Sequence, residues 1–283
     1  MNMIKLELML KDFFMEDIGD GDLSGESIFS NDERGSFSLI AKESGIFCGK
    51  SIIETGFKLM DSTCETKVFL RDGEFVDKSQ VIAEIHGTME GLLKAERVVL
   101  NLIQRMSGIS TLTNKAVQLT EGTKAKVCDT RKTTPGIRML EKYAVRCGGG
   151  FNHRMGLYDA VMLKDNHIAF AGGITNAVQK VRQSVGHTVK IEVEIESKEQ
   201  MLEAIEAGAD IIMFDNREPS EIQSWISHVP SHIVTEASGG ISFENLRSYA
   251  ESGVEWISLG YLTHSYKALD ISAKVLNNGS KGE

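Results

Sequence analysis

The sequence has little of what marks fibrous, disulfide-stabilised or membrane-spanning proteins. It holds three prolines and four cysteines in 283 residues, and the cysteines show no C-x-x-C spacing, which argues against a zinc site and a disulfide framework. No apolar run approaches the ~18 residues of a membrane span. The formal net charge of −9 argues against general binding to nucleic acid or to an anionic membrane. The charged residues within 1–14 are not those of a secretory signal. We therefore expect an ordered, globular, cytoplasmic protein with reduced thiols.

Positive charge is concentrated in one segment of this acidic chain, 129–167. Between Arg131 and Lys164 lie seven basic and two acidic side chains, a net charge of +5. Arg outnumbers Lys there, and Gly, Pro, Thr and His are interleaved, as in loops. The guanidinium group is a rigid fork that suits carboxylates and phosphates. The segment predicts a pocket for an anion with several charges; the alternative is a solvated helix face of Lys and Glu pairs.

Hydrophobic periodicity divides the chain into two kinds of structure. The first part predicts strands at 36–41, 64–70 and 80–86 and a long helix at 91–119. The second alternates strands with helices at the spacing of βα units, which favours a closed or nearly closed barrel; no G-x-G-x-x-G supports a dinucleotide-binding sheet. Residues 269–276 are expected to return as a strand to the first sheet, and 277–283 to be disordered. The strands predicted for the second part are 126–129, 160–163, 188–195, 211–214, 232–235 and 255–259.

Polar residues follow each of these six strands. In a parallel βα barrel the loops after the strands meet at one mouth and bind the ligand. Six polar strand ends in succession therefore predict one site. The segments are 129–132, 164–167, the alternating glutamates Glu192, Glu194 and Glu196, then 215–216, 236–240 and 260–264.

The glutamates alternate with apolar residues and so share one face of their strand, which we expect to be the barrel interior. Buried carboxylates must be paired or must bind metal. Glu194 with Asp215 on the next strand suits Mg²⁺, largely through water. The alternative is salt bridging to the basic residues without metal. Spacing does not choose between Glu192 and Glu194.

Three further features have two interpretations each. Ser238-Gly239-Gly240, followed by a helix expected to start near Ser242, is either a phosphate seat or a structural turn. His264, with Gly260 after the next strand, either completes the phosphate site or caps a helix. Lys164 is either a Schiff-base lysine or a point charge on an anion, and the other cations favour the point charge.

Several blocks together resemble the quinolinate phosphoribosyltransferase family. The resemblance covers almost the whole chain, with no departure at a motif position. The matching blocks are 16–22, 96–97 with 107–109, 129–136 (DTRKTTPG), 142–149 (KYAVRCGG), 152–154 (NHR), 164–167 (KDNH), 236–240 (EASGG) and 263–265 (THS).

The resemblance implies an α/β fold: an N-terminal α/β sandwich at 1–108, joined by 266–283, and an incomplete α/β (TIM-like) barrel at 109–265. It implies a homodimer with a shared active site, and leaves a hexamer open. The reaction would join quinolinate to phosphoribosyl pyrophosphate with Mg²⁺, giving nicotinate mononucleotide, pyrophosphate and CO₂ in de novo NAD synthesis. The remaining alternatives are a same-fold paralogue linked to molybdate transport and a non-catalytic sensor of an anionic metabolite.

The resemblance also implies roles for individual residues. Arg97 would come from the partner subunit, and Arg138 would serve the mouth of the site or the partner's site. Glu194 and Asp215 would position Mg²⁺ through water and, with Lys132 and Lys164, would take part in catalysis. Quinolinate would be held by Arg97, Thr130, Arg131, Lys132, His153, Arg154 and Lys164. Phosphoribosyl pyrophosphate would be held by Arg138, Glu194, Asp215, Ser238, Gly239, Gly240, Gly260 and His264.

Overall fold

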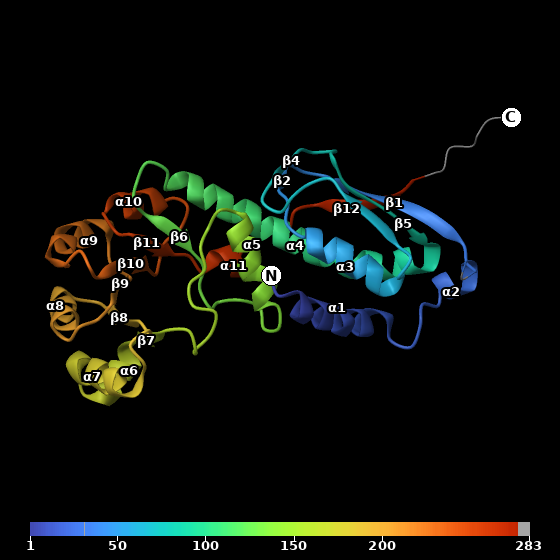
Figure 1. The fold of residues 1–283 in the computed structure, drawn as a ribbon. Helices are drawn as coiled ribbons and strands as arrows, with labels where there is room; N and C mark the ends of the chain where they lie inside the picture. The colour runs from blue at the N-terminus through green and yellow to red at the C-terminus, as the bar shows by residue number, and fades with distance from the viewer. Residues whose placement is uncertain (31, 277–283) are drawn as a thin grey trace. The chain divides into compact units, whose positions relative to one another are not determined.

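The computed structural model describes residues 1–30 and 32–276 and divides the chain into two compact units. Unit 1 comprises Met1–Leu112, Met139–Gly149 and the chain from Tyr266 on; unit 2 comprises Thr113–Arg138 and Gly150–Ser265. Figure 1 shows helices and strands in both units. The 277–283 segment, expected to be disordered, lies outside the described residues.

Unit 1 is built on an antiparallel sheet in the order β12-β1-β5-β3. The expected return of the C-terminal strand is confirmed, because Leu39 of β1 pairs with Ala273 of β12. The strands are β1 (Arg34–Ala41), β2 (Gly45–Ile46), β3 (Glu65–Val68), β4 (Phe75–Val76), β5 (Val81–Thr88) and β12 (Ile271–Val275). The helices are α1 (Met3–Ile18), α2 (Gly25–Ile28), α3 (Lys50–Met60), α4 (Met89–Leu119), which continues into unit 2, and α5 (Arg138–Cys147).

The long helix α4 buries the apolar face that its periodicity predicts. Leu92, Ala95, Val99 and Met106 are each at most 2% exposed. Glycine is required where α3 begins beside α4, because a Cβ on Gly49 would lie 2.5 Å from Cγ2 of Ile103. Close packing of this kind, together with apolar burial, holds the helices of unit 1 together.

Unit 2 contains a parallel sheet in the order β6-β11-β10-β9-β8-β7. Within the described chain β6 and β7 do not pair, and an isolated bridge from Cys128 to Phe151 stands beside β6. The predicted incomplete α/β barrel is confirmed. The strands are β6 (Lys126–Cys128), β7 (Val161–Leu163), β8 (Ile191–Ile195), β9 (Ile211–Asp215), β10 (Val234–Ser238) and β11 (Trp256–Ser258). The helices are α6 (Asp165–Ala171), α7 (Ile174–Ser184), α8 (Lys198–Glu206), α9 (Pro219–Trp225), the 3₁₀ turn η1 (Ile226–His228), α10 (Leu246–Glu251) and α11 (Tyr261–His264).

The strands of unit 2 use their two faces differently. Along β8, Ile191, Val193 and Ile195 are fully buried, and helices α7 and α8 pack against this strand. The alternate residues Glu192 and Glu194 share the opposite face. Apolar packing on one face thus leaves the other for the polar residues of a site.

Two local expectations are wrong. Strand β8 ends at Ile195, as predicted, but Glu196 does not share the interior face of Glu192 and Glu194: it lies one residue past the strand, exposed, where its N–H donates to Oε1 of Gln200 (2.7 Å). The helix expected near Ser242 begins at Leu246, because Ser242 N–H donates to Oδ1 of Asn245 in a turn before it.

No helix in the described part of the chain is both long and apolar enough to cross a membrane.

Candidate active site

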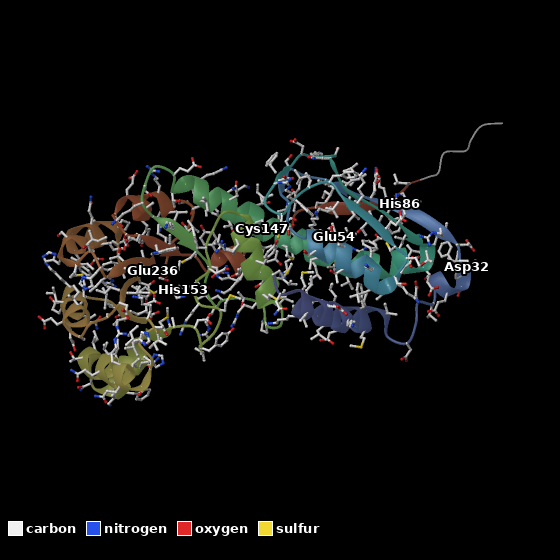
Figure 2. The ribbon with its side chains drawn as sticks, in the orientation of Figure 1. Asp32, Glu54, His86, Cys147, His153 and Glu236 are labelled. Atoms are coloured by element: carbon white, nitrogen blue, oxygen red, sulfur yellow. The ribbon has the colours of Figure 1, made fainter. Side chains whose placement is uncertain are left out.

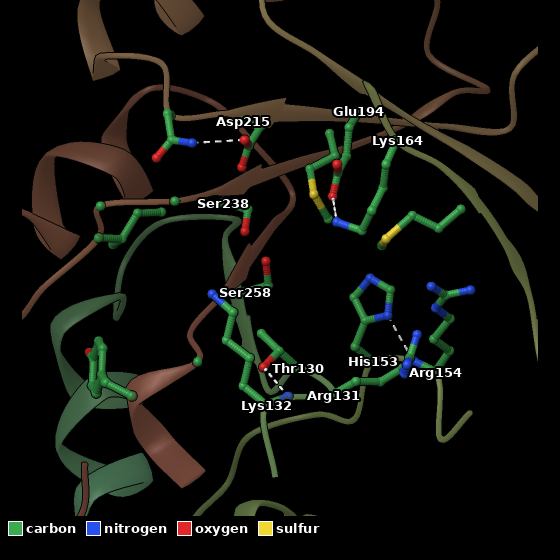
Figure 3. Close-up of a pocket in the computed structure, with 18 of the residues that line it drawn as sticks. Thr130, Arg131, Lys132, His153, Arg154, Lys164, Glu194, Asp215, Ser238 and Ser258 are labelled. Carbon is green, nitrogen blue, oxygen red and sulfur yellow. Dashed lines mark hydrogen bonds and ion pairs between the residues drawn. The ribbon is translucent and has the colours of Figure 1, made fainter. Parts of the chain in front are cut away.

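A cavity of about 600 Å³ opens among the strand ends of unit 2 (Figure 3). Basic, carboxylate, hydroxyl and glycine residues line it together. The lining residues are Thr130, Arg131, Lys132, His153, Arg154, Met162, Lys164, Glu194, Met213, Asp215, Asn216, Ser238, Gly239, Gly240, Ile241, Ser258, Gly260, Tyr261 and His264.

Buried Asp129, at the end of β6, organises the basic side of the cavity. Its Oδ1 accepts the backbone N–H of His153 (2.9 Å), and its Oδ2 accepts Nδ2 of Asn152 (2.6 Å). Charge-assisted bonds of this kind are among the stronger hydrogen bonds in proteins. Asp129 therefore fixes the Asn152–Arg154 segment beside the loop that carries Arg131 and Lys132.

Hydrogen bonds hold the basic residues in place. Lys132 N–H donates to Oγ1 of Thr130 (3.0 Å), and its carbonyl accepts Oγ1 of Thr263 (2.9 Å). In Figure 3 the Lys132 side chain extends toward Ser238 and Ser258. Arg154 donates from Nη1 to the carbonyl of Ala160 (3.0 Å). Burial, and then the charge of Arg131, lower the pKa of Arg154, so an anion placed between these two guanidinium groups would relieve their repulsion.

The carboxylates that line the cavity are already engaged. Lys164, at the end of β7, forms an ion pair with Glu194 on β8 (Figure 3). Burial raises the pKa of Glu194, and the Lys164 pairing opposes this rise. Asp215, at the end of β9, accepts Nδ2 of Asn216 (2.7 Å). Two carboxylates on adjacent strands facing one cavity form an oxygen-rich edge that suits Mg²⁺.

Two buried carboxylates lie next to His153, which Figure 2 labels together with Glu236. Nε2 of His153 is 3.3 Å from Oε2 of Glu192 and 3.5 Å from Oε1 of Glu236. Its Nδ1 accepts the backbone N–H of Arg154 (2.8 Å), which leaves the proton on Nε2, facing the carboxylates. Burial, and then the charge of Glu192, raise the pKa of Glu236 to about 7. Strand spacing did not choose between Glu192 and Glu194, and Glu236 was predicted only as part of the 236–240 segment.

Glycines shape the opposite wall. Gly239 has a φ of +83°, and a Cβ there would lie 2.3 Å from Oδ1 of Asn216. A Cβ on Gly260 would lie 3.0 Å from Cδ of Lys132. His264, on α11, has Nδ1 2.7 Å from Oγ of Ser265. Glycine is therefore required at Gly239, where the φ is left-handed and Asn216 lies close, while the space around Gly240 is open.

The cavity gathers most, but not all, of the residues predicted for the site. Arg97 and Arg138 are absent from its lining among the described residues. Arg97 is exposed on α4. Arg138 donates from Nε to Oγ1 of Thr133 (2.8 Å) and from Nη1 to the carbonyl of Met155 (3.0 Å), so it ties together two loops of unit 2. Glu196, expected beside Glu194, is also outside the lining. The lining residues that lie outside the predicted strand-end segments and the 152–154 block are Met162, Met213, Ile241 and Ser258.

Two family models match the chain, one over each part. Residues 22–107 match the quinolinate phosphoribosyl transferase N-terminal domain, and residues 109–274 match the C-terminal domain.

Named relatives match over almost the whole chain. A probable carboxylating nicotinate-nucleotide pyrophosphorylase of Bacillus subtilis (strain 168) is 54% identical over 100% of this chain and 98% of its own. A probable enzyme of the same name from Synechocystis is 40% identical over 97% and 94%. The solved nicotinate-nucleotide pyrophosphorylase of Francisella tularensis superposes with a TM-score of 0.93 at 36% identity, covering 98% of both chains.

Proposed function

The chain belongs to the quinolinate phosphoribosyltransferase family, and from this we propose that the cavity of unit 2 is its active site. The enzyme transfers the phosphoribosyl group of phosphoribosyl pyrophosphate to quinolinate, with loss of CO₂, in de novo NAD synthesis. The observation that supports the site is one cavity with basic residues on one side and open glycine backbone on the other. A dicarboxylate and a sugar phosphate need these two surfaces side by side.

We assign quinolinate to the basic side. Arg131, Lys132, Arg154 and Lys164 provide four cationic groups around one volume, and Thr130 supports Lys132. The two ring carboxylates would lie near Arg131 and Arg154, whose positive charges repel one another. His153 would contact the ligand without adding a positive charge. Its Nδ1 accepts the backbone N–H of Arg154, and its single proton, on Nε2, faces Glu192 and Glu236.

We assign phosphoribosyl pyrophosphate to the opposite wall. Ser238, Gly239 and Gly240, with Gly260 and His264, surround the space for the 5′-phosphate. Glu194 and Asp215 face the ribose hydroxyls and would hold Mg²⁺, largely through water. When bound, Mg²⁺ would neutralise charge on the pyrophosphate.

The chemistry then follows from placement and charge. Departure of pyrophosphate builds positive charge at the anomeric carbon, which the carboxylates of Glu194 and Asp215 stabilise. The ring nitrogen of quinolinate, held by the basic side, captures that carbon. The resulting ring cation stabilises the electron pair left on the ring carbon when the neighbouring C–CO₂ bond breaks. CO₂ leaves, and the ring carbon takes up a proton from water in its place. Lys132 and Lys164 orient the reacting groups, and no covalent enzyme intermediate is needed.

We also propose a homodimer in which Arg97 enters the partner's cavity. Arg97 is exposed on α4 and does not line the cavity of its own chain. Mixing Arg97→Ala with Arg131→Ala subunits tests this. Random exchange makes half of the dimers mixed, with one intact site each, so activity should recover to about a quarter of wild type. Activity that stays at the level of the two variants would contradict a shared site.

The reaction itself is tested by chromatography of the products. Nicotinate mononucleotide should form only when quinolinate, phosphoribosyl pyrophosphate and Mg²⁺ are all present. A molybdate-linked paralogue would leave quinolinate unused. A sensor would bind it without product, and a Schiff-base enzyme would be trapped at Lys164 by borohydride with a carbonyl substrate.

We also propose that the enzyme acts in the cytoplasm, a reducing compartment that suits an enzyme with cysteines but no disulfide framework.

A further inference from the structure

Two cysteines that are far apart in the sequence meet in unit 1. Cys48 precedes α3, and Cys147 is the last residue of α5, labelled in Figure 2. Their Sγ atoms and a carboxylate oxygen of Asp72 all lie within 4.8 Å of one another. A C-x-x-C search does not find this pair, because the fold rather than the sequence brings it together.

The backbone on both sides of the pair is fixed by hydrogen bonds. Cys48 N–H donates to Oγ of Ser107 (3.0 Å), and that hydroxyl donates back to the carbonyl of Cys48 (3.2 Å). Oδ1 of Asp72 accepts the N–H of Gly49 (2.7 Å), and its Oδ2 accepts the hydroxyl of Tyr143 on α5 (2.7 Å). The loop before α3 and the end of α5 are therefore held together whether or not the sulfurs are bonded.

The two thiols differ in accessibility and acidity. Cys48 is fully buried, and burial raises the pKa of its thiol; Cys147 is partly exposed. A hydrogen bond from the Cys48 thiol is the largest cause of the lowered pKa of Cys147. The thiolate is the form that reacts with oxidants. Cys147 is thus suited to react first, and Cys48 to resolve the product.

Asp72 argues against a metal at this cluster. Its carboxylate already accepts the N–H groups of Gly49 and Lys50 and the hydroxyl of Tyr143. A bound zinc ion would have to compete with these bonds. A bond between the two sulfurs would leave all of them in place.

We propose that Cys48 and Cys147 are a modification site that forms a reversible disulfide on exposure to a peroxide. The Cys147 thiolate attacks one peroxide oxygen, the O–O bond breaks, and the other oxygen leaves as water after taking a proton. The sulfur of Cys48 then attacks the resulting sulfenic acid, the S–O bond breaks, and the second water leaves with the Cys48 proton. Two thiols lose two electrons in all, and one peroxide is reduced to two waters. A dithiol reductant reverses the reaction by exchange.

The test uses the full-length enzyme treated with hydrogen peroxide, then alkylated and digested for mass spectrometry. A peptide joining Cys48 to Cys147 should appear, the intact mass should fall by about 2 Da, and dithiothreitol should reverse both changes. The cross-linked protein should also unfold several degrees higher, because the bond closes a long loop.

Variants distinguish this pairing from general oxidation. Cys64→Ser, at a half-buried cysteine in the same unit, should keep the cross-link. Cys48→Ser should lose it and leave Cys147 with added oxygen. The proposal is overturned if wild-type Cys147 goes to sulfinic acid while Cys48 remains open to alkylation after unfolding. Zinc that co-purifies at one ion per chain and protects both thiols would overturn it as well.

Discussion

Replacing Lys164 by methionine removes one cation from the cavity and keeps the length of the side chain. We expect kcat/KM for quinolinate to fall, because Lys164 would no longer meet a ring carboxylate. A hydrogen bond to a charged group contributes roughly 1.5–3 kcal/mol, which corresponds to about 10- to 100-fold in rate.

The structure places the expected loss at the lower end of that range. Lys164 is already paired with Glu194, so quinolinate must share or displace an existing partner. Only the difference between the two interactions appears in the kinetics, and we expect about a 10-fold loss. The loss should fall on quinolinate more than on phosphoribosyl pyrophosphate.

Initial rates of nicotinate mononucleotide formation, with each substrate varied in turn, measure this loss. Lys190→Met is the matched control, because it removes the same charge just before β8. Lys190 is 67% exposed on its side chain, pairs with Asp210 at 3.4 Å and lies outside the cavity lining. Equal effects of the two variants, or full activity of Lys164→Met, would show that Lys164 does not hold a ring carboxylate.

Three further changes test other parts of the site. Arg131→Ala should lower kcat/KM about 10- to 100-fold in the same rate assay, and full activity would remove quinolinate from this side of the cavity. Gly239→Ala should raise the KM for phosphoribosyl pyrophosphate, because its Cβ would meet Asn216; Gly208→Ala, at a similar φ of +82° with open space around it, should not. The pKa of Glu236 is about 7 in the folded chain against 4.5 as its ordinary value, so the free energy of unfolding should fall as pH rises through this window, by roughly 3 kcal/mol. Glu236→Gln should flatten that fall in urea unfolding between pH 5 and 8, and an unchanged slope would contradict the assignment.

Periodicity and strand spacing were enough to predict the barrel and the set of strand ends that meet at the cavity. Each parallel strand delivers its following residues to the same edge, so Arg131, Lys164, Asp215 and Ser238 converge whatever the details of packing. The buried face of α4 could also be predicted, because helical spacing determines which residues share a side of the helix.

Local breaks in regular structure were predicted only in part. The strand end at Ile195 is as predicted, but the alternation was extended one residue too far, to Glu196, which lies where the chain turns into α8. The turn at Ser242 depends on one side-chain bond to Asn245, which delays α10 to Leu246. Periodicity does not register such single bonds.

The contacts of His153 with two carboxylates could not be predicted from the sequence. Glu192 and Glu236 lie on strands β8 and β10, which are separated by β9, so no spacing in the sequence joins them. The carboxylates became recognisable only when the sheet order placed both beside one imidazole ring.

The most direct test of the proposed reaction is release of CO₂ from quinolinate labelled at the carboxylate next to the ring nitrogen. We expect one CO₂ for each pyrophosphate, and none when phosphoribosyl pyrophosphate or Mg²⁺ is left out. Quinolinate that binds in the complete mixture without losing CO₂, or that loses CO₂ without phosphoribosyl pyrophosphate, would contradict it.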